Sequence, residues 1–128
     1  MTYYINKTLV SGFDEALART IAALQTEGFG ILTEINVAET LHKKLGVEFP
    51  AYRILGACNP ALAFEAFTLE NRVGTMLPCN VVVRDAGDGK TEIAAIDPVA
   101  SMQAIDNPAL KKAAAQVREK LARVIATL

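Results

Sequence analysis

A glycine-rich turn between two strand-like runs is the feature that most constrains the fold. The turn occupies residues 85–90 and contains Gly87 and Gly89, and the runs that flank it span residues 75–84 and 91–97. A turn this short joins antiparallel strands, because parallel neighbours need a crossover of about a dozen residues or more. The sequence therefore predicts a hairpin and a sheet that is at least partly antiparallel.

The rest of the chain alternates between strand and helix periodicity. Apolar residues predict further strands over residues 3–10, 29–35 and 52–58. Helical spacing predicts helices that begin near positions 11, 36, 60 and 108. The order β-α-β-α-β-α-β-β-α predicts an α+β fold, an antiparallel sheet with helices packed on it. The length of 128 residues predicts a single compact domain over 1–128.

Polar residues mark the expected helix starts. Asn59 and Asn107 each precede a proline, the pattern of an N-cap followed by a first helical residue whose N–H would be unpaired anyway. Ser11 and Asn36 each precede an acidic residue three positions later, which is the capping-box pattern. We therefore expect all four side chains to cap helices.

Charge and apolar run length exclude several classes of function. The chain has 13 basic and 14 acidic residues, for a net charge of −1. Nucleic-acid binders normally carry a basic excess, so we expect no nucleic-acid partner. The longest uncharged stretches have 11 residues, and about 20 are needed to cross a bilayer, so we expect no membrane partner. The lack of a basic and apolar leader, together with only two cysteines, predicts an intracellular, cytoplasmic protein.

Three motifs resemble a known family. They are YRILGACNP at residues 52–60, LPCNVVV at 77–83 and IDP at 96–98. These motifs resemble the bacterial and archaeal family called domain of unknown function 302, over nearly the whole chain. The resemblance implies a compact α+β fold like that of the TATA-box-binding protein group, with helices on an antiparallel sheet, and it implies homodimers. It implies no reaction, and a shared fold alone gives no warrant for DNA binding.

Two Cys-Asn pairs mark the candidate ligand-binding site. The residues predicted to form it are Cys58, Asn59, Pro78, Cys79 and Asn80. Strand alternation predicts that Cys58 shares a face with Tyr52, Ile54 and Gly56, and that Cys79 shares one with Val81 in the core. The two thiols would then lie on the same side of the sheet. A proline in a strand implies an edge or a bulge, which would aim Asn80 at a pocket.

The thiols leave three interpretations of function open. As small buried hydrophobes, they favour a non-catalytic ligand-binding or accessory domain with its pocket near the Cys-Asn pairs. Alternatively, Cys58 and Cys79 serve a thiol-based redox enzyme or sensor, or bind a soft metal. His42, expected to be solvated, is a weak third metal ligand, and a closed zinc site needs about four. We expect no cofactor, and the sequence identifies no catalytic residue.

The predicted helix after Asn59 has apolar residues on more than one side. Leu62 and Leu69 share a face, whereas Phe64 and Phe67 point elsewhere at 100° per residue. One face can cover the sheet, so the other needs a second partner. The sequence predicts a homodimer with Phe64 or Phe67 at its interface, unless residues 47–51 cover these rings within one chain.

Overall fold

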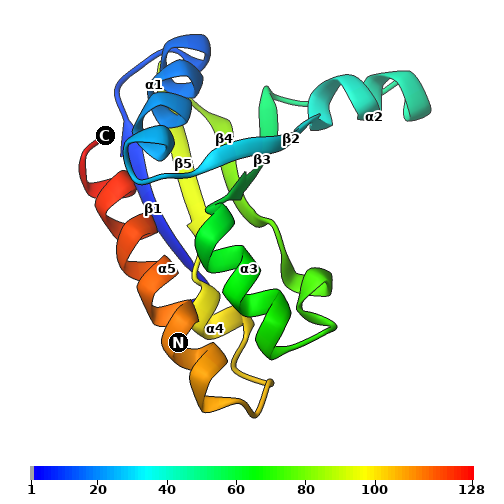
Figure 1. Ribbon diagram of the computed structural model, residues 1–128. Coiled ribbons are helices and arrows are strands. Elements are labelled where there is room, and N and C mark those ends of the chain that lie inside the picture. Colours follow the sequence, from blue (N-terminus) through cyan, green and yellow to red (C-terminus); the bar gives the residue numbers. More distant parts are fainter. Residues whose placement is uncertain (1) are drawn as a thin grey trace.

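The computed structural model describes residues 2–128 and contains a five-stranded antiparallel sheet with the strand order β1-β5-β4-β3-β2 (Figure 1). The strands are β1 (Tyr4–Leu9), β2 (Gly30–Asn36), β3 (Tyr52–Cys58), β4 (Cys79–Gly87) and β5 (Lys90–Ile96). The helices are α1 (Phe13–Thr26), α2 (Val37–Leu45), α3 (Pro60–Leu69), α4 (Pro98–Ser101) and α5 (Pro108–Ala126), with a 3-10 turn, η1 (Val73–Met76). The predicted α+β class is confirmed.

The predicted hairpin joins β4 to β5. Gly87 and Gly89 both have positive φ angles, 84° and 73°, and Asp88 between them has φ 55°. Glycine adopts this left-handed region without the steric cost that a Cβ imposes. The glycine spacing therefore reflects the conformation that the turn requires.

Helices α1, α3 and α5 lie on the same face of the sheet (Figure 1). The main core lies between that sheet face and α1 and α5, and Leu24, Phe29 and Leu121 fill it. On the other face, Asn80, Val82, Arg84, Glu92, Ala94 and Ile96 line a shallow hollow. Among residues 2–128, no helix is long and apolar enough to cross a bilayer.

The predicted face of β3 is wrong by one residue. Leu55 pairs with Val81 and Ala57 pairs with Cys79, and all four are buried in the core. Paired residues in a sheet point to the same side, so the odd-numbered positions of β3 face the helices. The other set of this strand, Tyr52, Ile54, Gly56 and Cys58, carries no charge, whereas the buried set includes Arg53. Period two therefore favoured the wrong face.

The region before β4 also differs from the prediction. Residues 75 and 76 belong to η1, and the strand starts at Cys79, after a cis peptide bond between Leu77 and Pro78. Proline cannot donate to a strand ladder, which explains why pairing begins after it rather than through it.

Two helix starts differ from the sequence interpretation. Gly12, not Ser11, is the N-cap of α1, and the Ser11 hydroxyl instead donates to the Gly12 carbonyl. The short helix α4 was not predicted. The Asp97 carboxylate caps it by accepting from the N–H groups of Val99 and Ala100 at 3.0 and 3.4 Å. Asp97-Pro98 is the same cap-then-proline signal as at Asn59, followed by too few residues to show a helical period.

Helix α2 projects away from the rest of the molecule as an arm (Figure 1). It contains no buried residue, although Asn36 caps it as predicted by accepting from the Glu39 N–H at 3.0 Å. Residues 47–51 continue this arm, and Phe49 packs edge-on against Tyr52. They do not cover the rings of α3, since Phe64 is 74% exposed and Phe67 is 48% exposed.

Candidate functional site

A cavity of about 140 Å³ lies where α3 and α5 meet the ends of β3 and β4. Its lining is largely apolar and comes from six elements and the segments between them. The lining residues are Phe29, Leu32, Ala57, Cys58, Asn59, Leu62, Ala63, Ala66, Phe67, Leu77, Pro78, Cys79, Pro98, Met102, Leu110, Ala113, Ala114 and Val117. We call this the sulfur pocket, because Cys58, Cys79 and Met102 all border it.

Four of the five predicted site residues border this pocket: Cys58, Asn59, Pro78 and Cys79. The fifth, Asn80, is exposed and lines the shallow hollow on the other face of the sheet. Consecutive strand residues point to opposite sides, so Cys79 and Asn80 cannot both face one pocket. The expected role of Asn80 at this pocket is therefore wrong.

Asn59 positions the first turn of α3. Its side-chain oxygen accepts from the Leu62 N–H at 3.4 Å, and its Nδ2 donates to the Glu27 carbonyl at 3.3 Å. The predicted cap is confirmed, and the second bond ties α3 to the turn that precedes β2. Gly28 lies in this turn at φ 82°, and a Cβ there would be 3.0 Å from Asn59 Nδ2. Both the oxygen and the nitrogen of the Asn59 amide therefore form hydrogen bonds to backbone groups.

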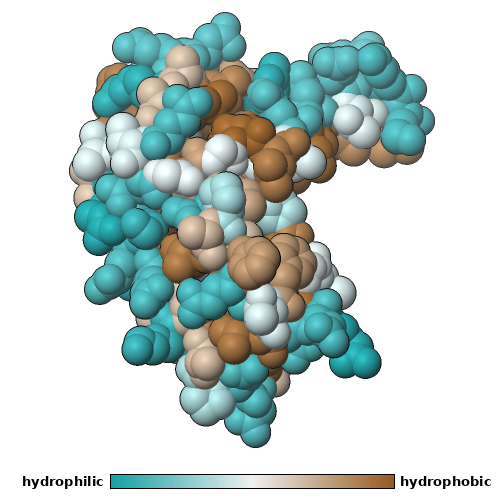
Figure 2. Space-filling view, viewed as in Figure 1, coloured by the Kyte–Doolittle hydropathy of each residue, from teal (hydrophilic) through white to brown (hydrophobic). Residues whose placement is uncertain are grey.

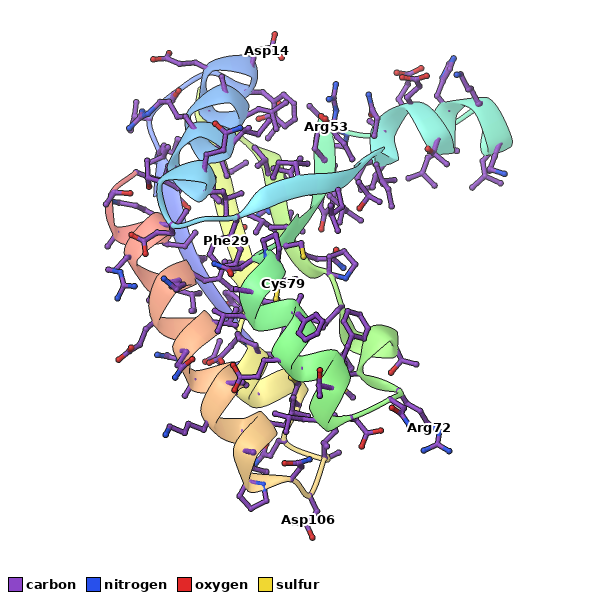
Figure 3. The ribbon with its side chains drawn as sticks, in the orientation of Figure 1. Asp14, Phe29, Arg53, Arg72, Cys79 and Asp106 are labelled. Carbon is purple, nitrogen blue, oxygen red and sulfur yellow. The ribbon has the colours of Figure 1, made fainter. Side chains whose placement is uncertain are left out.

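Cys79 is buried, with 5% of its surface exposed, as its alternation with Val81 along the strand predicted. Burial raises the pKa of its thiol to about 11, and the negative charge of nearby Cys58 adds to this effect. Cys58, by contrast, is half-buried at the end of β3, and both cysteines are free thiols. Figure 3 shows Cys79 beside the first turn of α3. Both cysteine residues therefore border one pocket. However, Ala57 rather than Cys58 shares the sheet face of Cys79, so the prediction that the two thiols lie on the same side of the sheet is wrong.

Pro78 packs closely over β3 at Gly56. A Cβ on Gly56 would lie 2.8 Å from Pro78 Cγ and would clash with the Thr33 hydroxyl of β2. Glycine at this position lets the segment before β4 and the neighbouring strand approach β3 closely. The absence of a side chain at Gly56 thus leaves room for Pro78 beside the pocket.

His42 does not join the cysteines. It is exposed on α2, with its Nδ1 3.5 Å from a carboxylate oxygen of Glu48. Across residues 2–128, no three His, Cys, Asp or Glu side chains are grouped so that they could hold a metal ion. The weak metal set of Cys58, Cys79 and His42 is therefore not assembled in this structure.

The far wall of the pocket was missed by the sequence reasoning. Met102, Leu110 and Ala114 come from the last third of the chain and are buried. Helical spacing predicted a buried face for Leu110 and Ala114 but placed Met102 in no element, and no local signal connects the three residues to the Cys-Asn pairs. The buried Asp97 helps to hold this wall, because it caps α4 and accepts from Arg118 Nε of α5 at 2.9 Å.

The family model described as domain of unknown function DUF302 matches residues 5–128. The chain belongs to the DUF302 family. A crystal structure of an uncharacterized conserved DUF302 protein from Bacillus stearothermophilus is 31% identical in sequence, with a TM-score of 0.90. The match covers 98% of each chain.

No curated protein matches this DUF302 chain. The family description and that of the Bacillus stearothermophilus protein name no reaction and no ligand. No specific function is established by these similarities. The relative nevertheless has the same fold over nearly its full length, so the resemblance predicted from the motifs is confirmed.

Proposed function

We propose that this DUF302 protein is a non-catalytic domain that binds a small apolar ligand in the sulfur pocket. The single observation that supports this proposal is a largely apolar cavity of about 140 Å³ that two distant parts of the chain enclose together. Such a concave apolar site is the usual form of a small-molecule pocket.

The size and chemistry of the pocket limit the ligand. A cavity of roughly 150 Å³ in another protein accepts benzene, whereas drug-sized ligands occupy about 300 Å³ or more. The Asn59 amide already bonds to Leu62 and Glu27, so it offers few free hydrogen bonds. The expected ligand is therefore an uncharged molecule of about the size of benzene, or the apolar end of a longer one.

Benzene is the probe that tests this proposal. A ligand that binds only the native state raises the melting temperature, by an amount that grows with the logarithm of its concentration relative to its Kd. We expect benzene to raise the melting temperature of the wild-type protein, and Ala63→Leu, which fills the pocket from α3, to abolish that rise. Ala18→Leu makes the same change on the exposed face of α1 and should respond like the wild type. No rise in the wild type, or an equal rise in Ala63→Leu, would contradict the proposal.

Thiol redox chemistry is the second candidate, because both cysteines border the same pocket. A reactive cysteine is normally accessible and has a lowered pKa. Cys79 has neither property, since it is buried and its pKa is raised to about 11. Cys58 would have to be the attacking thiol. We rank this candidate second for that reason.

We also propose that the protein is a cytoplasmic homodimer. Phe64 is 74% exposed and Phe67 is 48% exposed on α3, and apolar side chains gather over α3 in Figure 2. Exposed apolar patches on soluble proteins often mark interfaces. The free state of both cysteines agrees with a reducing compartment.

A further inference from the structure

All three tyrosines of the chain border the shallow hollow on the sheet face opposite α1, α3 and α5. The hollow has a volume of about 440 Å³, compared with about 140 Å³ for the sulfur pocket. The rings of Tyr3 and Tyr4 meet edge-on beside β1, with centroids 5.0 Å apart, and Tyr52 is the first residue of β3. Each tyrosine combines an apolar ring with a hydroxyl, so this surface suits a ligand that has both apolar and hydrogen-bonding parts.

Small side chains on the middle strands give the hollow its floor. Ala94 of β5 pairs with Val82 of β4, and both side chains point to the open face of the sheet. Tyr4 and Tyr52 belong to β1 and β3, and β5 and β4 lie between these two strands. Neighbouring strands are about 4.8 Å apart, so the backbones of the two tyrosines are separated by at least about 14 Å. Stacked rings lie about 4.5–7 Å apart, so this spacing favours a ligand longer than one flat ring.

The polar groups of the hollow are held in place and have free hydrogen-bonding capacity. Glu92 accepts from Asn6 Nδ2 at 2.8 Å and from Arg84 Nε at 2.7 Å, and these bonds lower the pKa of its carboxyl. Arg84 and Glu92 are the charged residues of the lining, and their charges cancel. Within residues 2–128, the terminal nitrogens of Arg84 and the amide of Asn80 form no hydrogen bond. The hollow therefore offers donors and acceptors without a net charge.

We propose that this hollow binds a neutral saccharide of at least two rings. Sugar hydroxyls both donate and accept, so they can accept from Arg84, donate to Glu92 and do both with the Asn80 amide. The C–H faces of the sugar rings would pack on the tyrosine rings at the two ends of the hollow. Its volume lies within the range of about 300–1,000 Å³ that is usual for ligand sites. The site lies on the other sheet face from the sulfur pocket and does not depend on the ligand proposed there.

Intrinsic tyrosine fluorescence tests the inference on the full chain. The protein contains no tryptophan and all its tyrosines border the hollow, so this signal reports on the proposed site alone. The probes are four neutral disaccharides at millimolar concentration: maltose, cellobiose, lactose and trehalose. We expect at least one of them to change the fluorescence in a saturable way. Its affinity should change by less than about twofold when NaCl is raised tenfold, because neither the ligand nor the site has a net charge to screen.

Two variants locate the binding site. Ala94→Leu fills the floor of the hollow, and Asn80→Ala removes an exposed amide that forms no hydrogen bond within residues 2–128. Each should weaken disaccharide binding at least tenfold, and thermal melting shows whether each is folded. Ala86→Leu is the matched control, because it makes the same change at an exposed position of β4 outside the hollow, and it should bind like the wild type. The inference is wrong if no disaccharide saturates the signal, if both variants bind as well as the wild type, or if benzoate, a charged single ring, binds where the disaccharides do not.

Discussion

Cys79 illustrates how the surroundings of a single side chain control its chemistry. The thiol belongs to the main core and borders the pocket between α3 and α5, and burial penalises only its charged form. An increase in pKa from 9.0 to about 11 lowers the thiolate fraction at neutral pH about a hundredfold. Cys79 therefore behaves at physiological pH as a small apolar residue.

The raised pKa of Cys79 predicts a loss of stability at high pH. In the unfolded chain the thiol ionises near pH 9, whereas in the folded protein it stays protonated up to about pH 11. The folded state therefore binds more protons in this window, and the free energy of unfolding should fall as the pH rises, by up to about 3 kcal/mol. Urea denaturation at pH 8, 9 and 10 measures the fall.

The matched control for this prediction is Cys79→Ala, which removes the ionisable group. Other groups also titrate at high pH, so the expected result is a smaller fall in Cys79→Ala than in the wild type. Equal falls in the two proteins would show that Cys79 does not cause the alkaline loss. Rapid labelling of Cys79 by iodoacetamide in native Cys58→Ser at neutral pH would show that the thiol is not buried.

At the scale of the helices and strands, short polar and glycine signals set the boundaries. Asn59 and Asn107 each accept from a backbone N–H three residues later, and each donates to a distant carbonyl, that of Glu27 and of Leu69. A cap of this kind both begins a helix and fixes it to another segment. The two asparagines therefore join local and tertiary structure.

Asn59→Ala should lower the free energy of unfolding by about 1–2 kcal/mol. The substitution removes the N-cap of α3 and leaves the Glu27 carbonyl without its partner. Asn71→Ala, in the exposed turn after α3, is the matched control and should change stability by less than about 0.5 kcal/mol. Chemical denaturation of both variants checks the prediction, and equal effects would show that the cap is energetically unimportant.

Gly56→Ala should destabilise the protein by about 1–3 kcal/mol, because the added methyl group overlaps the Pro78 ring and the Thr33 hydroxyl. Gly30→Ala is the control on the neighbouring strand, where a Cβ would meet no atom within 4 Å. It should be neutral or slightly stabilising, since alanine restricts the unfolded chain more than glycine does. Thermal melting that ranked the two variants in the opposite order would refute this account of Gly56.

Local signals predicted the elements better than the site. The α3 and α5 starts and the β4–β5 hairpin were predicted correctly, because caps, prolines and turn glycines act within a few residues. Four pocket residues were predicted from two motifs, but α5 and α4 could not be assigned to the pocket, since that contact depends on tertiary packing. The prediction of the buried face of β3 was wrong for a different reason. The face of this strand that points away from the helices is also apolar, so alternation alone does not identify the buried side.

At the scale of the whole molecule, apolar side chains remain exposed outside the core. They occupy two places: Phe64 and Phe67 on α3, and the arm, where Leu45, Val47 and Phe49 are exposed. Figure 2 shows apolar residues along the inner side of the arm as well as over α3. An isolated helix shorter than about 12 residues is marginal in water, so α2, with nine residues, gains from a contact outside its own chain.

Light scattering at micromolar concentration should give about twice the chain mass of 13.7 kDa. Phe64→Asp should shift the protein towards the monomer, because it places a charge within the apolar patch of α3. Ala61→Asp, at an exposed position of the same helix, is the control and should leave the mass unchanged. A particle of 13.7 kDa in the wild type would reject the homodimer, and a dimeric Phe64→Asp would place the interface elsewhere.

The geometry of the arm also bears on how the chain could be shortened. Strands β2 and β3 are antiparallel neighbours, and their pairing ends at Asn36 opposite Arg53. A tight turn could therefore connect these two positions directly, because the sheet has already brought them together. The intervening residues contribute nothing to the buried core. We therefore expect the sheet to keep its register when a tight turn replaces the arm, and we expect the arm to matter more for contacts with other molecules than for the core of its own chain.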